Sequence, residues 1–294
     1  MKALRLLSAI ALLAIGSTSA RAQMLRVLVT NDDGVAAPGI SALVSELAAN
    51  ANLDITVIAP ATNSSGTGDN KTLSPIVVTT SMTAGGFPAE AVMGFPADSV
   101  LFGILQELQA DPPDLVVSGI NLGQNMPAEI IPLSGTVGAA YWAARLGVPA
   151  IAVSASIASP NYADAASFVG KIVEKFRKSS GFRKKMKEKE APFRGLVLNV
   201  NYPTCTTGTD VRGARVVAVG RLTTITGYTL TGPNTWQPTV VNLSFNSDCT
   251  STLAAPVTDI EAWNNGFVAV SPLNADRSLT GRKLKQFGFI EKLF

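Results

Sequence analysis

Histidine is absent from all 294 residues of the chain, and this absence removes whole classes of chemistry. Ser-His-Asp and Cys-His catalysis need an imidazole, and so does every metal site with histidine ligands. Cysteine is scarce as well, because Cys205 and Cys249 are the only two. Any chemistry must therefore rest on carboxylates, hydroxyls, amides and amines, together with a hard metal ion that oxygen ligands can hold.

Charged residues are also few, at 15% of the chain, and the formal net charge is only +3. Lys2, Arg5 and Arg21 lie in the first 22 residues, so the remainder of the chain is close to neutral. Nucleic-acid-binding proteins usually carry an excess of positive charge, and we therefore expect no DNA or RNA complex. The hydrophobic share of 47% is ample for the core of one large α/β unit.

The first 22 residues have the order of a secretory signal peptide. Basic residues come first, an apolar run from Leu6 to Ile15 follows, and small residues around Ala20 and Ala22 form a cleavage site. The apolar run is too short for a permanent membrane anchor. We expect cleavage near Ala22 and an exported protein, periplasmic or secreted; an uncleaved anchor or a buried helix is the alternative.

The two cysteines are consistent with export. In an oxidising compartment an isolated pair is more typical of a disulfide than of a metal site or a nucleophile. A disulfide between Cys205 and Cys249 is therefore expected, although spacing alone does not show that the two residues come close enough.

The stretch from Leu25 to Gly39, LRVLVTNDDGVAAPG, contains the most informative motif of the chain. Its apolar, β-branched beginning predicts a buried strand that delivers Asp32 and Asp33 to a turn. Adjacent carboxylates repel each other and lose solvation, so a divalent cation with oxygen ligands is their natural partner. Asn, Asp and Gly are also ordinary turn and capping residues, so the turn alone leaves both interpretations open.

Further strands alternate with helices, which favours a mostly parallel sheet with functional loops at the carboxyl ends of its strands. The strand over 54–59 leads into a Ser/Gly-rich loop over 61–70, where the hydroxyls of Ser64 and Ser65 could lie beside the two acids. A flexible connection is the alternative for this loop. The strand over 115–117 leads into a predicted loop over 118–125, where Asn121 offers a hard amide oxygen.

A third loop ends at Ser134, Gly135 and Thr136 and opens a helix of small residues. The free backbone N–H groups of such a turn favour an anion such as phosphate, and a plain helix cap by Ser134 or Thr136 is the alternative. From Gly195 onward short strand-like segments predominate, the last of them over 287–293. They predict a β-rich extension that follows the α/β core.

These motifs together closely resemble the SurE (survival protein E) family, metal-dependent phosphatases that act on nucleoside 5′- and 3′-monophosphates. The resemblance runs through essentially the whole chain after residue 22, in the segments TNDDGVAAPGI, SGTG, GFPADSV, PDLVVSGINLGQN, SGTVGAA, VPAIAVS, LVLNVNYP and TDIEAWNNGFVAVSPL. It implies a Rossmann-like, three-layer α/β domain over residues 23–294. Within it, an α/β core would span about 23–200, and a β-rich extension with the C-terminal segment about 201–294.

The resemblance also implies roles for single residues. A divalent ion, Mg²⁺ or Mn²⁺ with Ca²⁺ as an alternative, would be held by Asp32, Asp33, Ser65 and Asn121. Asp32 and Asp33 would be the catalytic acids of a hydrolysis by a metal-activated water. The phosphate and substrate pocket would be lined by Asn31, Gly34, Asn125, Ser134, Gly135 and Thr136. Homodimers or homotetramers are expected, built partly by exchanged hairpins over 228–250 or by the C-terminal segment.

One loop departs from the family pattern. The link Met126–Leu133 is one residue longer than usual and lacks a tyrosine, which leaves the substrate preference open. Within the enzyme class, the alternative is a broad acid phosphatase or exopolyphosphatase on the same site. Outside it, the alternative is a nucleotide- or phosphate-binding protein without turnover. A dinucleotide-dependent dehydrogenase is disfavoured because no GxGxxG follows the first strand.

Overall fold

The structure is a computed structural model that describes residues 24–181, 184, 195–222, 224–240 and 245–275. The predicted signal peptide over 1–22 and the predicted strand over 287–293 lie outside these residues. None of the described helices is long and apolar enough to cross a membrane.

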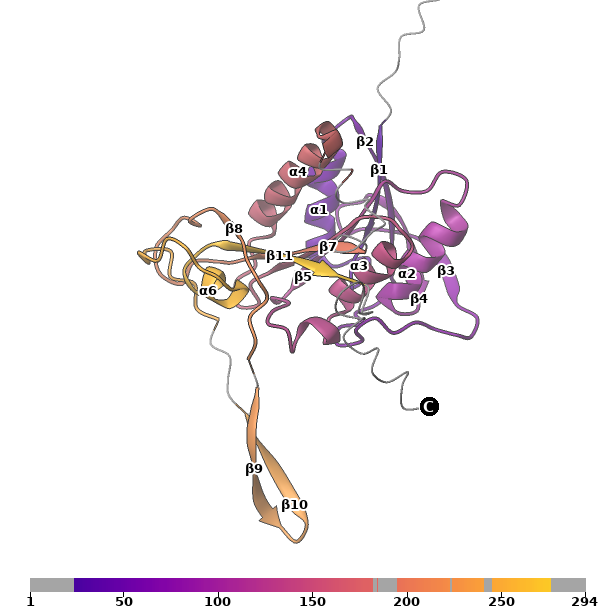
Figure 1. The fold of residues 1–294 in the computed structure, drawn as a ribbon. Helices are drawn as coiled ribbons and strands as arrows, with labels where there is room; N and C mark the ends of the chain where they lie inside the picture. Colours follow the sequence, from indigo (N-terminus) through magenta and orange to yellow (C-terminus); the bar gives the residue numbers. More distant parts are fainter. Residues whose placement is uncertain (1–23, 182–183, 185–194, 223, 241–244, 276–294) are drawn as a thin grey trace, which may run out of the picture.

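A nine-stranded sheet forms the centre of the molecule (Figure 1). Its strands are β1 (Leu25–Thr30), β2 (Leu53–Pro60), β3 (Val77–Met82), β4 (Pro88–Met93), β5 (Leu115–Leu122), β6 (Ala150–Ala155), β7 (Leu196–Tyr202), β8 (Ala214–Val216) and β11 (Val268–Asn274). They lie in the order β3-β4-β2-β1-β5-β6-β7-β11-β8. The six neighbours from β4 to β7 run parallel, whereas β3 and β11 run antiparallel to β4 and β7. The predicted mostly parallel α/β fold is thus confirmed.

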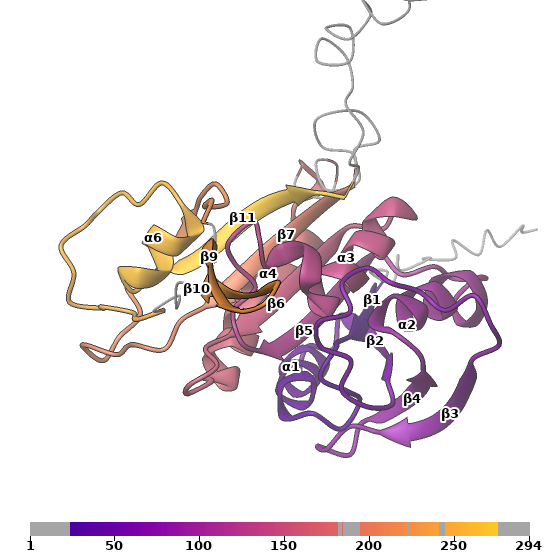
Figure 2. The ribbon, with the colours of Figure 1, turned by 90° about the horizontal axis from the view of Figure 1, so that it is seen from below.

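Helices cover both faces of the sheet, as parallel strands require (Figures 1 and 2). One face carries α1 (Pro38–Ala48) and α4 (Tyr162–Lys178). The other carries α2 (Pro96–Phe102), continued by the π-helical segment η1 (Gly103–Glu107), and α3 (Gly135–Arg145). Two further short helices are η2 (Ile131–Leu133) and α6 (Asp259–Asn264).

Packing rather than intrinsic propensity stabilises α1. An isolated helix of 11 residues is marginal in water. Pro38 suits its first turn, and Ile40, Leu43 and Leu47 are almost completely buried against the sheet and α4. Each such side chain contributes about 1.5–3 kcal/mol when it is removed from water. The helix therefore begins at a defined point, one short turn after the two aspartates.

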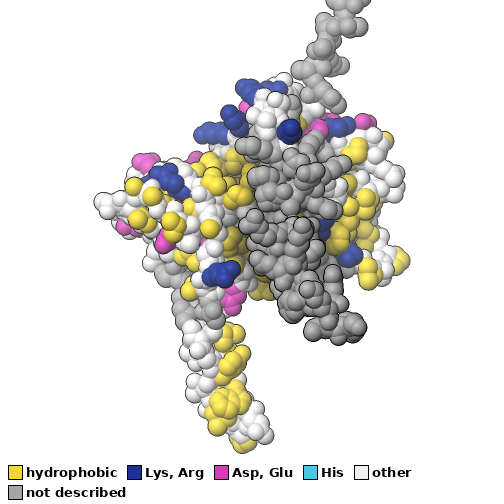
Figure 3. Space-filling view, in the orientation of Figure 1, with side chains coloured by type: hydrophobic (Ala, Val, Ile, Leu, Met, Phe, Trp, Pro, Cys, Tyr) yellow, Lys and Arg dark blue, Asp and Glu magenta, His cyan; other side chains and the backbone are white. Residues whose placement is uncertain are grey.

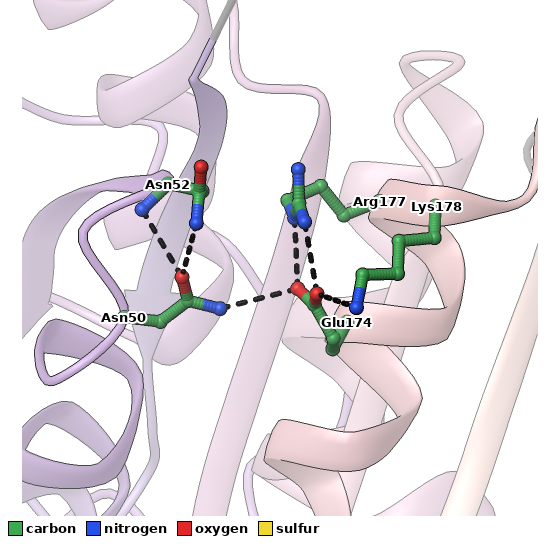
Figure 4. A network of polar contacts seen from close by, with 5 residues as sticks. All are labelled: Asn50, Asn52, Glu174, Arg177 and Lys178. Atoms are coloured by element: carbon green, nitrogen blue, oxygen red, sulfur yellow. Dashed lines mark hydrogen bonds and ion pairs between the residues drawn. The ribbon is translucent and has the colours of Figure 1, made fainter. Parts of the chain in front are cut away.

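A polar cluster joins the far end of α1 to α4 (Figure 4). The side-chain amide of Asn50 donates to Glu174 Oε2 at 3.1 Å. Arg177 Nε and Lys178 Nζ each approach the same carboxylate within 2.8 Å. These contacts secure the two helices far from the carboxyl ends of the strands, so they support the fold and not the site.

The chain after β7 combines a continuation of the main sheet with a separate hairpin. The segment β11 inserts between β7 and β8, which extends the sheet beyond the parallel strands. The hairpin of β9 (Ile225–Gly232) and β10 (Thr235–Val240) projects away from the body of the molecule (Figure 1). Cys205 and Cys249 form a disulfide with a Cα–Cα distance of 5.6 Å. The predicted fold with extra strands in its C-terminal part is confirmed.

Two local predictions were incomplete. The strand β4 was not foreseen, and β5 does not end at Val117. It continues through Ser118, Gly119 and Asn121 to Leu122, because the neighbouring strand β6 pairs with Asn121 and Leu122 after an irregularity in register. Asn121 therefore lies within the strand and not in the loop that follows it.

Candidate functional site

The two adjacent acids lie where the sheet topology brings three segments together. The strand β1 has β2 and β5 as its neighbours, so the turn after β1 meets the loop after β2 and the end of β5. The backbone N–H of Ser64 donates to the carbonyl of Asp32 at 2.8 Å. The backbone N–H of Leu122 donates to Asp33 Oδ2 at 2.9 Å. These bonds hold the turn from both sides.

Asp32 points toward the beginning of α3 and is only 2% exposed. The hydroxyl of Thr136 donates to its Oδ1 at 2.6 Å. A Cβ on Gly135 would lie 2.8 Å from Asp32 Cβ, so only glycine lets the helix come this close. Burial raises the pKa of Asp32 to about 6, against the opposing effect of the Thr136 hydrogen bond. The charge of Asp33 adds to this rise.

Asp33 is less buried and is held by two donors. Besides the Leu122 N–H, the side-chain amide of Asn63 approaches its Oδ1 at 3.3 Å. Asn63 Oδ1 in turn accepts the backbone N–H of Ser65 at 2.9 Å. Burial raises the pKa of Asp33, and the Leu122 hydrogen bond opposes the rise. Burial, followed by the charge of Asp33, also raises the pKa of the nearby Tyr162.

Asn125 belongs to a buried polar network and not to an open pocket wall. Its side-chain amide donates to Ser154 Oγ at 2.8 Å and to the Thr136 hydroxyl at 3.2 Å. Its backbone N–H donates to Asn201 Oδ1 at 2.7 Å, and its carbonyl accepts from Asn199 Nδ2 at 2.8 Å. The network therefore reaches from β7 through Asn125 and Thr136 to Asp32.

The other predicted site residues differ in the hydrogen bonds that their side chains form. The side-chain amide of Asn31 donates to the carbonyl of Gly34 at 2.8 Å, while its Oδ1 is buried without a hydrogen-bond partner in the structure. The amide of Asn121 donates to the carbonyl of Gly123. The hydroxyl of Ser134 accepts the N–H of Val137, so the plain helix cap that the sequence left open is realised there. Ser65 is exposed on the loop over 61–70.

The atypical link over 126–133 is tied to the base of the projecting hairpin. Glu129 accepts the N–H and the hydroxyl of Thr224 at 2.8 and 2.9 Å. The N–H of Ala128 donates to the carbonyl of Gly220 at 3.0 Å, and Asp259 accepts the N–H of that glycine at 2.7 Å. The link that begins after Asn125 and ends before Ser134 is therefore shaped by residues from the β-rich part.

Sequence reasoning missed several residues of the site. Asn63, Ser154, Asn199 and Asn201 were not singled out. The signal for the last two was present, because asparagines two positions apart in an otherwise apolar strand lie on the same face of the sheet. Two buried amides there predict a polar network that must be satisfied.

Among the described residues, no lysine or arginine side chain neutralises the acidic pair. Within the described ranges, neither carboxylate forms an ion pair with lysine or arginine. The same residues hold no cluster of three or more acidic or cysteine side chains that could bind a metal ion. Hydroxyl and amide oxygens would have to complete any cation site built on Asp32 and Asp33.

Fold and site together define a class of protein: a doubly wound α/β protein whose acidic site lies at the carboxyl ends of parallel strands. The sequence model of the family described as "Survival protein SurE" matches residues 27–225, more than half of the chain. The chain belongs to the SurE family, as its motifs predicted.

Individual relatives agree with this assignment. A protein of Methanopyrus kandleri named 5′-nucleotidase SurE is 47% identical over 133 residues, which are 45% of this chain and about half (49%) of that protein. A protein of the same name from Desulfitobacterium hafniense is 33% identical over 86% of this chain and 92% of its own length. The crystal structure of a SurE protein from Aquifex aeolicus is 29% identical, with a TM-score of 0.68 over 90% of this chain and 99% of that one.

The raised pKa of Asp32 predicts how the stability of the metal-free protein depends on pH. The folded protein binds the proton of Asp32 more tightly than the unfolded chain does. The contribution of this proton to the free energy of unfolding is therefore complete below about pH 4 and is lost as pH rises through about 6. Its full size is about 3 kcal/mol. Asp32→Asn removes the charge, so this variant should be the more stable one at pH 8.

Urea unfolding in EDTA at pH 4.5, 6 and 8 measures this difference. The advantage of Asp32→Asn over the unmodified protein should grow from pH 4.5 to pH 8. The control is Asp54→Asn on the exposed side of β2, for which no such trend is expected. A difference in stability between Asp32→Asn and the unmodified protein that does not change with pH would contradict the raised pKa of Asp32.

Proposed function

We propose that this protein is a divalent-metal-dependent phosphomonoesterase that releases phosphate from nucleoside 5′-monophosphates, and also from 3′-monophosphates. The observation that carries the proposal is the pair of buried Asp32 and half-buried Asp33. The pKa values of both are raised, and the described residues provide no cationic partner for either. The names of the SurE relatives support the 5′-nucleotidase activity.

The donor set at the pair fits a hard divalent ion such as Mg²⁺ or Mn²⁺. Asp32, Asp33 and Asn121 would hold it through carboxylate and amide oxygens, and the hydroxyl of Ser65 would complete the set. When bound, such an ion neutralises charge on the phosphate and makes water more acidic. The unpartnered Oδ1 of Asn31 is a further oxygen close to the pair in sequence.

The protein's own residues would position the substrate and a proton. The phosphate would lie against the N-terminus of α3, where the first backbone N–H groups lack partners within the helix and the dipole favours an anion. Thr136 orients the carboxylate of Asp32 through its hydroxyl. Oriented in this way, the carboxylate of Asp32 would accept a proton from the attacking water.

The direct test is phosphate release from a panel of AMP, GMP, 3′-AMP, a sugar phosphate and polyphosphate. We expect release from nucleoside monophosphates that EDTA abolishes and Mg²⁺ or Mn²⁺ restores. The double variant Asp32→Asn/Asp33→Asn should lose about 10²- to 10⁴-fold in rate, because it removes both the ligands and the base.

The control for this test is Asp54→Asn, which should retain full activity. Preference for polyphosphate or the sugar phosphate would favour the broad phosphatase instead. Nucleotide binding without release under any metal would show a binding protein and overturn the enzymatic proposal.

We further propose that the chain forms a homodimer or homotetramer through the hairpin of β9 and β10. A two-stranded hairpin on its own is marginally stable in water. Large apolar side chains are nevertheless exposed on it: Tyr228 is 61%, Leu230 56% and Trp236 59% exposed. Apolar side chains lie along the outer part of the hairpin (Figure 3). Burial of this surface against a second copy would stabilise both.

Light scattering during gel filtration tests the oligomer. The unmodified protein should elute as a dimer or tetramer. Leu230→Asp/Trp236→Asp should lower the mass, because it places two charges on the apolar surface that the second copy would bury. The two residues are paired across the hairpin. Leu73→Asp, at a more exposed leucine outside the hairpin, is the matched control and should leave the mass unchanged. A monomeric unmodified protein would disprove the proposal.

We also propose that the protein is exported. The disulfide between Cys205 and Cys249 supports this, because such bonds persist in oxidising compartments. Expressed with its own N-terminus in a Gram-negative host, the protein should be found in the periplasm or medium, and its N-terminal sequence should begin at Gln23. Recovery of the chain with Met1 intact in the cytoplasm would contradict export.

A further inference from the structure

A cleft of about 360 Å³ opens beside Asp33, and the chemistry proposed above leaves it without a role. Its walls come from four segments: the turn over 34–38, the loop over 61–63, Leu122 at the end of β5 and Tyr162 at the beginning of α4. The cleft therefore begins at one of the two acids and extends toward the face of the sheet covered by α1 and α4.

The walls are mainly apolar. Ala36, Ala37 and Pro38 line it from the turn after β1, and Leu122 and Tyr162 are the largest apolar side chains among the lining residues. Leu122 is 45% exposed, which is unusual for a leucine in a strand whose other residues are buried. A concave, mostly apolar site with a few polar groups is typical of a small-molecule pocket.

The ring of Tyr162 is held in place by the close approach of α1 to the sheet. A Cβ on Gly39 would lie 1.9 Å from the carbonyl oxygen of Ile120 and 3.2 Å from Tyr162 Cε1. Glycine at this position therefore lets the tyrosine pack against the start of α1. The ring is half-buried, and its remaining surface borders the cleft.

We infer that this cleft is the nucleoside subsite, in which the base of the nucleotide packs against the ring of Tyr162. The inference rests on the proposed function: a phosphomonoester bound at the acidic pair has its nucleoside beside the pair, and the cleft bordered by Asp33 is a hollow that adjoins it. Stacking on an aromatic ring tolerates every base, because each base has a π-face.

The polar groups of the cleft offer little means to distinguish one base from another. The amide of Asn63 already binds Asp33 through Nδ2 and the N–H of Ser65 through Oδ1. The other polar groups among the lining side chains are those of Thr62 and Asp33 and the hydroxyl of Tyr162. The subsite should therefore accept several bases and favour the purines, which offer the larger stacking area.

The experiment compares AMP with ribose 5-phosphate, which has the same phosphate and sugar but no base. In metal-loaded protein, Tyr162→Leu should lower kcat/KM for AMP by roughly tenfold, mainly through KM, because a base–aromatic stack is lost. The value for ribose 5-phosphate should not change. Tyr162→Phe keeps the ring and should behave as the unmodified protein with both substrates.

Two further variants complete the design. Tyr202→Leu removes a half-buried tyrosine that packs against the same core but does not line the cleft, and it should affect neither substrate selectively. Ala36→Leu fills the cleft from an exposed position and should reproduce the selective loss for AMP even where Tyr162→Leu fails to fold. Circular dichroism checks the fold of each variant.

An equal loss for both substrates, or no loss for AMP, would overturn the subsite. If the unmodified protein hydrolyses neither compound, the proposed function fails, but calorimetry with adenosine still tests the cleft. Adenosine should then bind the unmodified protein and Tyr162→Phe, and bind Tyr162→Leu and Ala36→Leu at least tenfold more weakly. Equal adenosine binding by all four proteins, or none, would refute the inference.

Discussion

The placement of two adjacent carboxylates at the end of β1, Asp32 buried and Asp33 half-buried, is the constraint on which the rest of the site depends. Each carboxylate loses solvation and repels the other, so the pair is costly unless donors and a cation compensate. The protein supplies the donors. Thr136 serves Asp32 from α3, and the backbone of Leu122 serves Asp33 from β5. These bonds orient the acids but leave their charge uncompensated, which is the condition in which a cation binds best.

The hydrogen bonds that hold Asp32 continue into the core through a series of amide and hydroxyl groups. Asn125 links Thr136 to Ser154 and to the asparagines of β7, so α3, β6, β7 and the segment after β5 share one hydrogen-bonded unit. The paired groups of such a network favour one arrangement over its alternatives. Asn199 Oδ1 and Asn201 Nδ2, in contrast, are buried without a hydrogen-bond partner among the described residues. Through Asn125 and Thr136, the strands β6 and β7 thus help to orient the carboxylate of Asp32.

The β-rich part of the chain is also connected to this unit. Glu129, in the link between Asn125 and α3, binds Thr224 at the base of the hairpin, and α6 holds the neighbouring Gly220 through Asp259. Two-stranded and exposed, the hairpin has little to stabilise it by itself. Its attachment through Glu129 connects the hairpin to the link between Asn125 and Ser134.

The sequence by itself determined the alternation of buried strands and helices, the position of the acids after β1 and the family. These are local signals: apolar periodicity and contiguous motifs. Only the tertiary structure decided that β5 continues to Leu122, that Thr136 serves Asp32 while Ser134 caps the helix, and that Asn199 and Asn201 hold Asn125. Each of these depends on pairing between segments distant in sequence, and no local pattern encodes which partner a polar side chain will meet.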